Sequence, residues 1–457
     1  MDNYYFTGIG GIGMSAIAQL FRAEGDNVAG SDRNYDNGIN LNLFSKLVSQ
    51  DIEMYPQNGS GINLGLKNLV VSSAIETDNL DIKKAKECNI PITTRAELLA
   101  KIVNNRFGIA IGGSNGKTSV TALTGWILDY AGLDPTIIVG GYLNNYITKT
   151  TPGNYKSGKS NNVVIEADES DGSIVNYKPQ ISVITSISKD HKTIDELSAL
   201  FRTFANNTRE ELIINADCPN LKASKINNKK ITTYGIENNA DIMAEDIKYL
   251  SWGTKFRCGT VTFELNMPGK FNIFNSLAAI TVATKLKVPH ETIAKALVEF
   301  KGIESRMHII GNVNGNNIIN DYAHNPDKIK ASIEALKTHS EKDLIVIFQP
   351  HGYGPTKFFK EELISVFSSK LSRNDILIMP EIFYAGGTAN KCISSKDITD
   401  TLKTKGINAN YFLNRNEIID FLRIKEKINY NILILGARDY TLPDFCHDII
   451  RNLNNLY

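Results

Sequence analysis

The sequence has few cysteines, and none of them forms a recognisable pair. The 457 residues include five widely spaced cysteines and no CxxC motif, namely Cys88, Cys218, Cys258, Cys392 and Cys446. An odd number of isolated cysteines argues against a disulfide framework and against a structural zinc site. We therefore expect reduced thiols, as in a cytosol.

The chain also lacks an excess of charge and a long apolar run. Fifty basic residues against 49 acidic ones leave a formal net charge of +1, so there is no cationic field for nucleic acid or a membrane surface. No stretch reaches the roughly 18 apolar residues of a membrane-spanning helix. The first residues, MDNYYFTGIGG, do not resemble a signal peptide. We expect a cytoplasmic protein that binds neither nucleic acid nor a membrane.

Internal repeats and low-complexity segments are missing as well. What remains is an ordinary folded composition, 42% hydrophobic and 22% charged, and a length that predicts about three domains. Apolar segments of strand length alternate with helical segments, which favours parallel sheets covered by helices. We predict three consecutive α/β domains over residues 1–105, 106–303 and 304–457.

The pattern of apolar residues places the expected elements. Strands are predicted at residues 4–7, 27–32, 68–75, 107–111, 163–168, 181–187, 211–217, 317–321, 343–350, 375–381 and 431–437. Helices are predicted at residues 14–23, 81–88 and 120–132 and from about residue 274, and residues 218–268 are expected to be rich in strands.

The first strand leads into a glycine-rich turn. Gly8, Gly10, Gly11 and Gly13 lie in GIGGIG, a GxGxxG match between an expected strand and helix, and Asp32 ends the second strand. Glycines let the backbone approach a phosphate, and the carboxylate can accept a hydrogen bond from a ribose hydroxyl. The pattern predicts a diphosphate site for NAD or a UDP-sugar, and a turn that only packs tightly is the alternative.

A second glycine loop, between a strand and a helix, is more specific. It consists of Gly113, Ser114, Asn115, Gly116, Lys117 and Thr118. It resembles a shortened P-loop, in which backbone amides surround phosphate oxygens, the lysine neutralises phosphate charge and the threonine hydroxyl binds Mg²⁺. A plain turn before a helix, with a solvated lysine, is the alternative.

Two residues could complete a magnesium site beside this loop. Glu166 lies in IEADESD near the end of a buried strand, and His191 follows another apolar strand. A carboxylate is a suitable Mg²⁺ ligand. On its own, the acidic segment would be interpreted as a solvated loop and the histidine as a structural residue. Both become candidate metal ligands because a phosphate loop requires a metal ion nearby.

Taken together, these segments resemble one family. GIGGIGMSAIA, VVSSAI, GKT, EADESD, a DH after a strand, GKFNIFNSLAA, DYAHNP and FQPH occur in one order along the chain. The chain is similar to the Mur ligases of peptidoglycan synthesis, most closely to the branch that adds alanine. The resemblance implies a Rossmann-like UDP-substrate domain, a central P-loop-type ATPase domain and a Rossmann-like C-terminal domain that receives the amino acid.

The resemblance also implies a reaction. ATP phosphorylates the carboxylate of UDP-N-acetylmuramate, and an amino acid, by default L-alanine, attacks the acyl phosphate to form an amide, with Mg²⁺ as the metal. Three alternatives stay open, namely a paralogue with another amino-acid or muropeptide substrate, a non-catalytic nucleotide-binding protein, and an NAD-dependent oxidoreductase. The last leaves the loop at residues 113–118 unexplained.

Site residues follow from the resemblance, motif by motif. On the ATP side it implies that Gly116, Lys117 and Thr118 hold the phosphates and that Thr118, Glu166 and His191 bind Mg²⁺. It also implies that Asn272 and Asn275 lie near the adenine and that Asp321 holds the ribose. On the substrate side it implies binding by Ser73 and His324 with the first glycine turn, and it adds His351 and Arg306 to Lys117 and His191 as catalytic residues. Helix capping by the two asparagines is the plainer alternative.

The chain departs from the alanine-adding branch near the amino-acid site. After FQPH that branch has arginines suited to an amino acid's carboxylate, and here Gly352 and Pro355 occupy their positions. Neither can replace a guanidinium, although Lys357 or Arg438 could substitute. Smaller departures are Ser114-Asn115 in place of a threonine–histidine pair and Ser186 in place of an asparagine.

Overall fold

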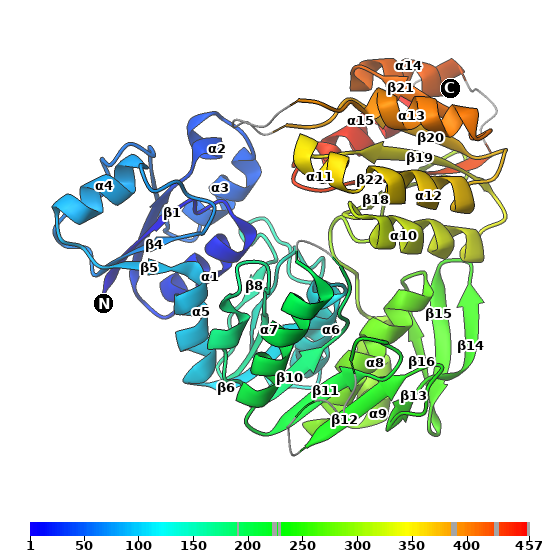
Figure 1. Ribbon diagram of the computed structural model, residues 1–457. Coiled ribbons are helices and arrows are strands. Elements are labelled where there is room, and N and C mark those ends of the chain that lie inside the picture. The colour runs from blue at the N-terminus through cyan, green and yellow to red at the C-terminus, as the bar shows by residue number, and fades with distance from the viewer. Residues whose placement is uncertain (190–191, 222–225, 227–229, 385–390, 425–428, 455–457) are drawn as a thin grey trace. The chain divides into compact units, whose positions relative to one another are not determined.

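The computed structural model describes residues 1–189, 192–221, 226, 230–384, 391–424 and 429–454 (Figure 1). The chain divides into two compact units. One comprises residues 1–248, 255–266 and 271–303, and the other residues 249–254, 267–270 and 304–457.

The first sheet has five parallel strands in the order β3-β2-β1-β4-β5. Its elements are β1 (Asn3–Thr7), α1 (Ile12–Ala23), β2 (Asn27–Ser31), α2 (Arg33–Asp36), α3 (Leu41–Val48), β3 (Glu53–Tyr55), β4 (Asn68–Val71), α4 (Leu80–Glu87), β5 (Ile92–Thr94) and α5 (Arg95–Asn104). The strand predicted at residues 68–75 is shorter than expected because the Ile75 amide turns back to the Ser72 carbonyl oxygen.

The second sheet has eight strands in the order β13-β12-β11-β10-β6-β9-β7-β8. All neighbours are parallel except β7 and β8. Its strands are β6 (Phe107–Gly112), β7 (Thr136–Ile138), β8 (Tyr155–Lys156), β9 (Asn162–Glu166), β10 (Ile181–Ile184), β11 (Glu211–Asn215), β12 (Ile231–Gly235) and β13 (Ile242–Met243), with the helices α6 (Lys117–Tyr130), η1 (Ser173–Asn176) and α7 (Ile194–Asn207). The interior strand β6 is small and apolar, FGIAIG, and nearly all of it is buried.

The β-rich stretch predicted before residue 268 includes a separate three-stranded sheet in the order β14-β15-β16. Its strands are β14 (Glu245–Leu250), β15 (Gly253–Cys258) and β16 (Val261–Leu265), and the helices α8 (Lys270–Lys285) and α9 (His290–Val298) follow. Helix α8 begins four residues before the predicted start, directly after Gly269, whose φ of +97° ends the preceding segment.

The last sheet has six strands in the order β17-β18-β22-β19-β20-β21. The edge strand β17 is antiparallel to β18, so this sheet is mixed at one edge and parallel elsewhere. Its elements are β17 (His308–Val313), β18 (Asn316–Asp321), α10 (Pro326–His339), β19 (Asp343–Gln349), α11 (Tyr353–Phe358), α12 (Lys360–Lys370), β20 (Ile376–Pro380), α13 (Ser395–Thr404), β21 (Ala409–Phe412), α14 (Arg415–Ile424), β22 (Tyr430–Gly436) and α15 (Leu442–Asn454).

Within the first unit, helix α1 is tied to the second sheet by buried amides. Asn154, fully buried, donates from Nδ2 to the Ile12 carbonyl oxygen over 2.7 Å and to Ser15 Oγ over 2.9 Å. Gln19 Nε2 donates to Asn154 Oδ1 over 3.1 Å. Buried amides rarely lack partners, so these bonds fix the first glycine turn relative to that sheet.

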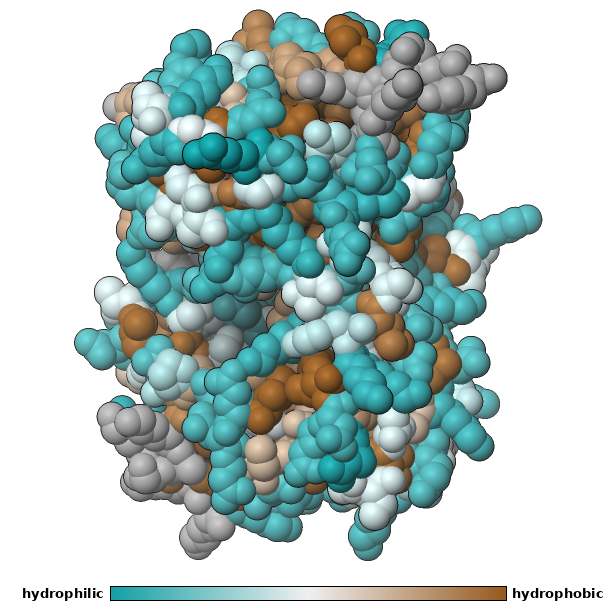
Figure 2. Space-filling model, turned by 90° about the vertical axis from the view of Figure 1, so that its right-hand side faces the viewer, coloured by the Kyte–Doolittle hydropathy of each residue, from teal (hydrophilic) through white to brown (hydrophobic). Residues whose placement is uncertain are grey.

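The surface carries apolar side chains mainly as scattered groups. Figure 2 shows one face on which polar residues predominate and apolar ones appear between them. Such scattered exposure is normal for folded proteins. Among the described helices, none is long and apolar enough to cross a bilayer.

Candidate functional site

The loop between β6 and α6 has a backbone that only glycine suits at two positions. Gly113 has φ +136° and Gly116 has φ +85°. A Cβ on Gly113 would lie 2.0 Å from Thr185 Oγ1, and one on Gly116 would lie 2.6 Å from Asn275 Oδ1. Neighbouring atoms therefore fill the space that side chains would need at these two positions. Backbone amides of such a loop at a helix start are groups that could bind an anion.

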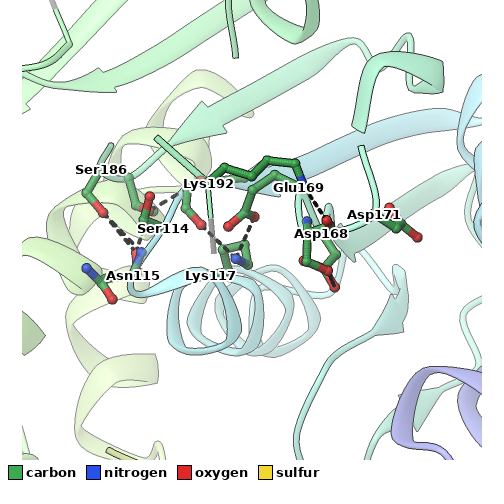
Figure 3. Close-up of polar contacts among 12 residues, drawn as sticks. Ser114, Asn115, Lys117, Asp168, Glu169, Asp171, Ser186 and Lys192 are labelled. Atoms are coloured by element: carbon green, nitrogen blue, oxygen red, sulfur yellow. Dashed lines mark hydrogen bonds and ion pairs between the residues drawn. The ribbon is translucent and has the colours of Figure 1, made fainter. Parts of the chain in front are cut away.

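Residues just after β10 hold the loop in place. The Ser114 amide donates to the Ser186 carbonyl oxygen over 2.9 Å, and Ser114 Oγ donates to the Ser188 carbonyl oxygen over 3.0 Å. Asn115 donates from its amide to Ser186 Oγ (Figure 3). Its side-chain Nδ2 donates to Ser188 Oγ. Asn115 Oδ1 is buried without a hydrogen-bond partner in the described structure, and such an atom commonly marks a place for a ligand or water.

Lys117 lies among three carboxylates. Its Nζ donates to Glu169 Oε2 over 2.6 Å and to the Gly113 carbonyl oxygen over 2.8 Å (Figure 3). Burial by itself would lower the pKa of Lys117, but Glu169, Asp168 and Glu166 outweigh burial and raise it. The buried side chain is therefore held as a cation at the loop of residues 113–118, and its role toward phosphates stays a prediction.

Two of the three predicted metal ligands lie beside one pair of glycines. Glu166 Oε2 accepts from the Gly140 amide over 3.0 Å, and a Cβ on Gly140 would lie 2.5 Å from that oxygen. A Cβ on Gly141 would lie 3.0 Å from Thr118 Cγ2. A hydroxyl and a carboxylate are oxygen donors that suit Mg²⁺. The third predicted ligand, His191, lies outside the described residues, and no cluster of three acidic, histidine or cysteine ligands occurs within them.

The two asparagines of α8 are brought to the loop. Asn272 and Asn275 are buried, and Asn275 Nδ2 donates to Asn272 Oδ1 over 3.1 Å. Because Asn275 Oδ1 fills the space beside Gly116, the pair supports the loop directly. Their distance from Gly116 along the chain hides this contact from the sequence.

In the first glycine turn, Asp32 contacts its own backbone neighbours. Its Oδ2 accepts from the Gly10 amide and its Oδ1 from the Asn34 amide, each over 2.8 Å. Burial raises the pKa of Asp32. The carboxylate thus closes the turn and caps α2, and a role toward a ribose stays a prediction.

The other predicted residues of this turn lie nearby. A Cβ on Gly8 would lie 2.9 Å from Ile75 Cδ1, which brings the turn containing the exposed Ser73 close to Gly8. Gly11 precedes α1, and a Cβ on Gly13 would lie 3.1 Å from an Arg95 guanidinium nitrogen. Arg95, which no sequence motif indicates, is therefore a further cation beside the start of α1.

In the second unit, Asp321 and Arg306 lie close together. Asp321 ends β18, is buried, and accepts a short hydrogen bond from Ser332 Oγ on α10. Burial raises the pKa of Asp321, and Arg306 opposes that rise. The Arg306 guanidinium lies 4.8 Å from the ring centre of Tyr322. A role for Asp321 toward a ribose stays a prediction.

His324 and His351 are also brought together. Their ring centres lie 5.4 Å apart, and His324 Nδ1 lies 2.8 Å from the Tyr322 carbonyl oxygen. Burial, reinforced by Lys328, lowers the pKa of His324 to about 2. His324 is therefore neutral at pH 7, with Nδ1 donating to the carbonyl.

The backbone explains why no arginine stands directly after FQPH. Gly352 has φ +71° and ψ 132°, precedes α11, and donates from its amide to the Phe383 carbonyl oxygen over 2.8 Å. Residues with side chains rarely adopt this conformation. Pro355 lies in the first turn of α11, where its missing amide hydrogen has no cost.

Comparisons with known proteins cover nearly the whole chain. Family models described as "Mur ligase family, catalytic domain", "Mur ligase middle domain" and "Mur ligase, glutamate ligase domain" match residues 3–107, 111–283 and 305–438. A UDP-N-acetylmuramate–L-alanine ligase of Caldanaerobacter subterraneus subsp. tengcongensis is 35% identical over 447 residues, which are 95% of this chain and 94% of the relative. One of Agathobacter rectalis is 36% identical over 449 residues, 95% of each chain.

Solved structures share the fold. A UDP-N-acetylmuramate–alanine ligase of Thermotoga maritima superposes with a TM-score of 0.81 at 23% identity, covering 100% of both chains. A murein peptide ligase of Psychrobacter arcticus gives 0.70 at 22% identity, again over 100% of both. At these identities the likeness establishes the three-domain α/β architecture.

Proposed function

The chain belongs to the Mur ligase family, and from this premise we propose that it is an ATP-dependent ligase of peptidoglycan precursor synthesis. It joins an amino acid, L-alanine by default, to UDP-N-acetylmuramate. The assignment rests on relatives with that activity over 95% of the chain and on one observation of the structure. That observation is the buried Lys117 ammonium at a loop whose Gly113 and Gly116 admit no side chain.

The reaction follows from the chemistry of carboxylates. A carboxylate does not react with amines because its oxygen is a poor leaving group. Transfer of the γ-phosphoryl group of ATP to that oxygen forms an acyl phosphate and ADP. The amine then attacks the carbonyl carbon, a proton leaves the nitrogen, and the carbon–oxygen bond to phosphate breaks, which yields an amide and phosphate.

Residues of the first unit supply the charge that this transfer requires. Approach of a carboxylate to a triphosphate is opposed by repulsion between anions, so fixed cations and amide donors lower the barrier. Lys117 and the loop amides would bind the phosphates. Thr118 and Glu166 would hold Mg²⁺, together with His191 by resemblance, and bound Mg²⁺ neutralises phosphate charge.

Residues of the second unit would complete ATP binding and receive the amino acid. We assign Asp321 to the ribose, His324 to substrate binding, and Arg306 and His351 to catalysis. The first glycine turn, with Ser73, would bind the UDP-substrate. We assign the reaction to the cytoplasm because ATP and UDP-sugars are available there.

A second candidate is a ligase of the same class with another acceptor, an amino acid other than alanine or a muropeptide. The observation that favours it is the backbone at Gly352, whose conformation residues with side chains, including the arginine expected there, rarely adopt.

A screen of acceptors tests both candidates. ADP release is measured with ATP, Mg²⁺, UDP-N-acetylmuramate and each of the twenty amino acids in turn. We expect release that depends on both the UDP-substrate and one amino acid, alanine by default. Stimulation by a different amino acid would favour the second candidate, and a chain that binds ATP without any stimulated release would contradict the ligase assignment.

A further inference from the structure

The carboxyl ends of three neighbouring strands meet at one edge of the last sheet. Strands β18, β22 and β19 are adjacent in that order, and ligands of parallel sheets bind beyond such strand ends. His324 follows β18, Arg438 follows β22 and His351 follows β19. The loop with Arg438 therefore leaves the sheet between the strands that carry the two histidines.

The position of this loop is fixed by Arg415. One guanidinium nitrogen of Arg415 donates to Gln349 Oε1, over 3.1 Å, and also to Asp439, and the other donates to Thr441 Oγ1 over 2.7 Å. Gln349 ends β19, two residues before His351, so the loop after β22 is tied to the strand that carries the histidine. Asp439, the acidic neighbour of Arg438, is neutralised by Arg415.

Arg438 itself is exposed and holds an unusual backbone conformation. Its φ is +63°, a left-handed value that costs a residue with a side chain roughly 1–2 kcal/mol. Within the described part of the chain it makes no hydrogen bond or ion pair. Strained residues with available chemistry concentrate at functional sites.

Two other cations, Lys328 and Arg306, lie close enough to His324 to lower its pKa, but both already interact with other groups of the chain. His324 is neutral, because burial keeps its pKa low. Gly352 and Pro355 carry no charge, and Lys357 lies further along, exposed on α11. A planar guanidinium is the group that binds a carboxylate through two parallel hydrogen bonds.

We propose that Arg438 binds the α-carboxylate of the incoming amino acid beside His324 and His351 and thereby selects amino acids over neutral amines. This inference rests on the proposed ligase function. A guanidinium on the loop after β22 takes the place of the arginines whose positions Gly352 and Pro355 occupy in this chain.

The test compares an amino acid with its amide, which lacks the carboxylate. The kcat and KM for L-alanine and L-alaninamide are measured by ADP release in the full chain and in Arg438→Gly. In the unchanged protein we expect L-alanine to be preferred in kcat/KM by about 10- to 100-fold, the worth of a charge-assisted hydrogen bond. In Arg438→Gly the KM for L-alanine should rise by that factor and the preference should fall to about one.

Three further arms separate the outcomes. Glycine suits the left-handed backbone, so Arg438→Gly should fold, and a melting temperature at least equal to that of the unchanged protein confirms it. Arg373→Gly removes an exposed arginine at the opposite, amino end of β20 and should leave both constants unchanged. An unaltered preference in Arg438→Gly, or a preference lost in Lys357→Ala instead, would overturn the inference.

Failure of the underlying function has a different signature. If the unchanged protein released no ADP with any of the twenty amino acids, the ligase assignment would fall and this inference with it. If another amino acid is the best acceptor, the same comparison with that amino acid and its amide tests Arg438.

Discussion

Lys117, at the start of α6, donates to Glu169, in the segment after β9, over 2.6 Å. Both side chains are largely buried, with exposed fractions of 13% and 7%. Buried ions are retained only where they are paired, so Glu169 keeps the lysine ordered and charged. Under the proposed function, the phosphates of ATP would compete with Glu169 for the same ammonium group.

Replacing the lysine should abolish turnover. Lys117→Ala removes the fixed cation that offsets charge on the transferred phosphoryl group, so ADP release should fall by about a thousandfold. The measurement is kcat in the coupled assay, with the exposed Lys178→Ala as the control, which should retain full activity. Near-normal turnover in Lys117→Ala would place ATP elsewhere.

Replacing Glu169 should strengthen the binding of ATP. Glu169→Gln keeps the size of the side chain and its ability to accept a hydrogen bond but removes the competing charge. The Kd for ATP should fall roughly fivefold, which equals about 1 kcal/mol, while the melting temperature of the protein without ATP falls. Isothermal titration and thermal unfolding check the two effects, and weaker ATP binding in this variant would mean that Glu169 assists the phosphates.

The glycine at the end of the loop allows strain to be separated from function. Gly116 and Gly132 both have left-handed φ values, +85° and +79°, but a Cβ on Gly132 would meet nothing within 4 Å. Alanine at Gly132 should cost roughly 1–2 kcal/mol in unfolding free energy, and alanine at Gly116 should cost more because its methyl group also meets Asn275. Only Gly116→Ala should also lose ATP binding, because its methyl group would collide with Asn275. Equal ATP affinities in the two variants would remove the loop from the ATP site.

His324 should make stability depend on pH. Its pKa is about 2 in the folded protein, against an ordinary value of 6.5. Below pH 6.5 the unfolded chain therefore takes up a proton that the folded protein refuses, and stability is lost as the pH falls. Between pH 7 and pH 5 the loss should be about 2 kcal/mol.

Urea unfolding at pH 7 and pH 5 gives the free energy of unfolding at each pH, and the difference between the two values is compared among variants. His324→Asn can still donate to the Tyr322 carbonyl oxygen but cannot titrate, so its stability should fall by about 2 kcal/mol less than that of the unchanged protein. The exposed His447→Asn serves as the control and should behave like the unchanged protein. The same fall in His324→Asn and in the unchanged protein would assign the pH dependence to other groups.

Much of the fold could be predicted because its signals are local. A buried strand, two required glycines and a helix identify the loop at residues 113–118 without tertiary information. The strand that ends early at Val71 and the helix that begins at Lys270 were mispredicted because turns at Ser72 and Gly269 set those ends. The antiparallel pairing of β17 depends on tertiary packing, which periodicity does not report. The division after residues 105 and 303 stays a prediction.

The site was predicted only where a motif carried it. Glu169 was visible as part of an acidic segment, but its pairing with Lys117 depends on the fold. Asn275 contacts Gly116 although 159 positions of sequence separate them, so the contact could not be predicted from the sequence. Arg95 lies in no recognisable motif, so nothing in the sequence indicated it. The conformation of Gly352, which an arginine would rarely adopt, becomes evident only from the backbone.

The most direct test of the account follows the carboxylate oxygen. UDP-N-acetylmuramate labelled with ¹⁸O in its carboxylate is converted with ATP and the accepted amino acid, and the released phosphate is analysed by mass spectrometry. Activation as an acyl phosphate predicts one ¹⁸O atom in each phosphate. Unlabelled phosphate, formed at the same rate as the amide, would contradict phosphoryl transfer to the carboxylate and with it the proposed mechanism.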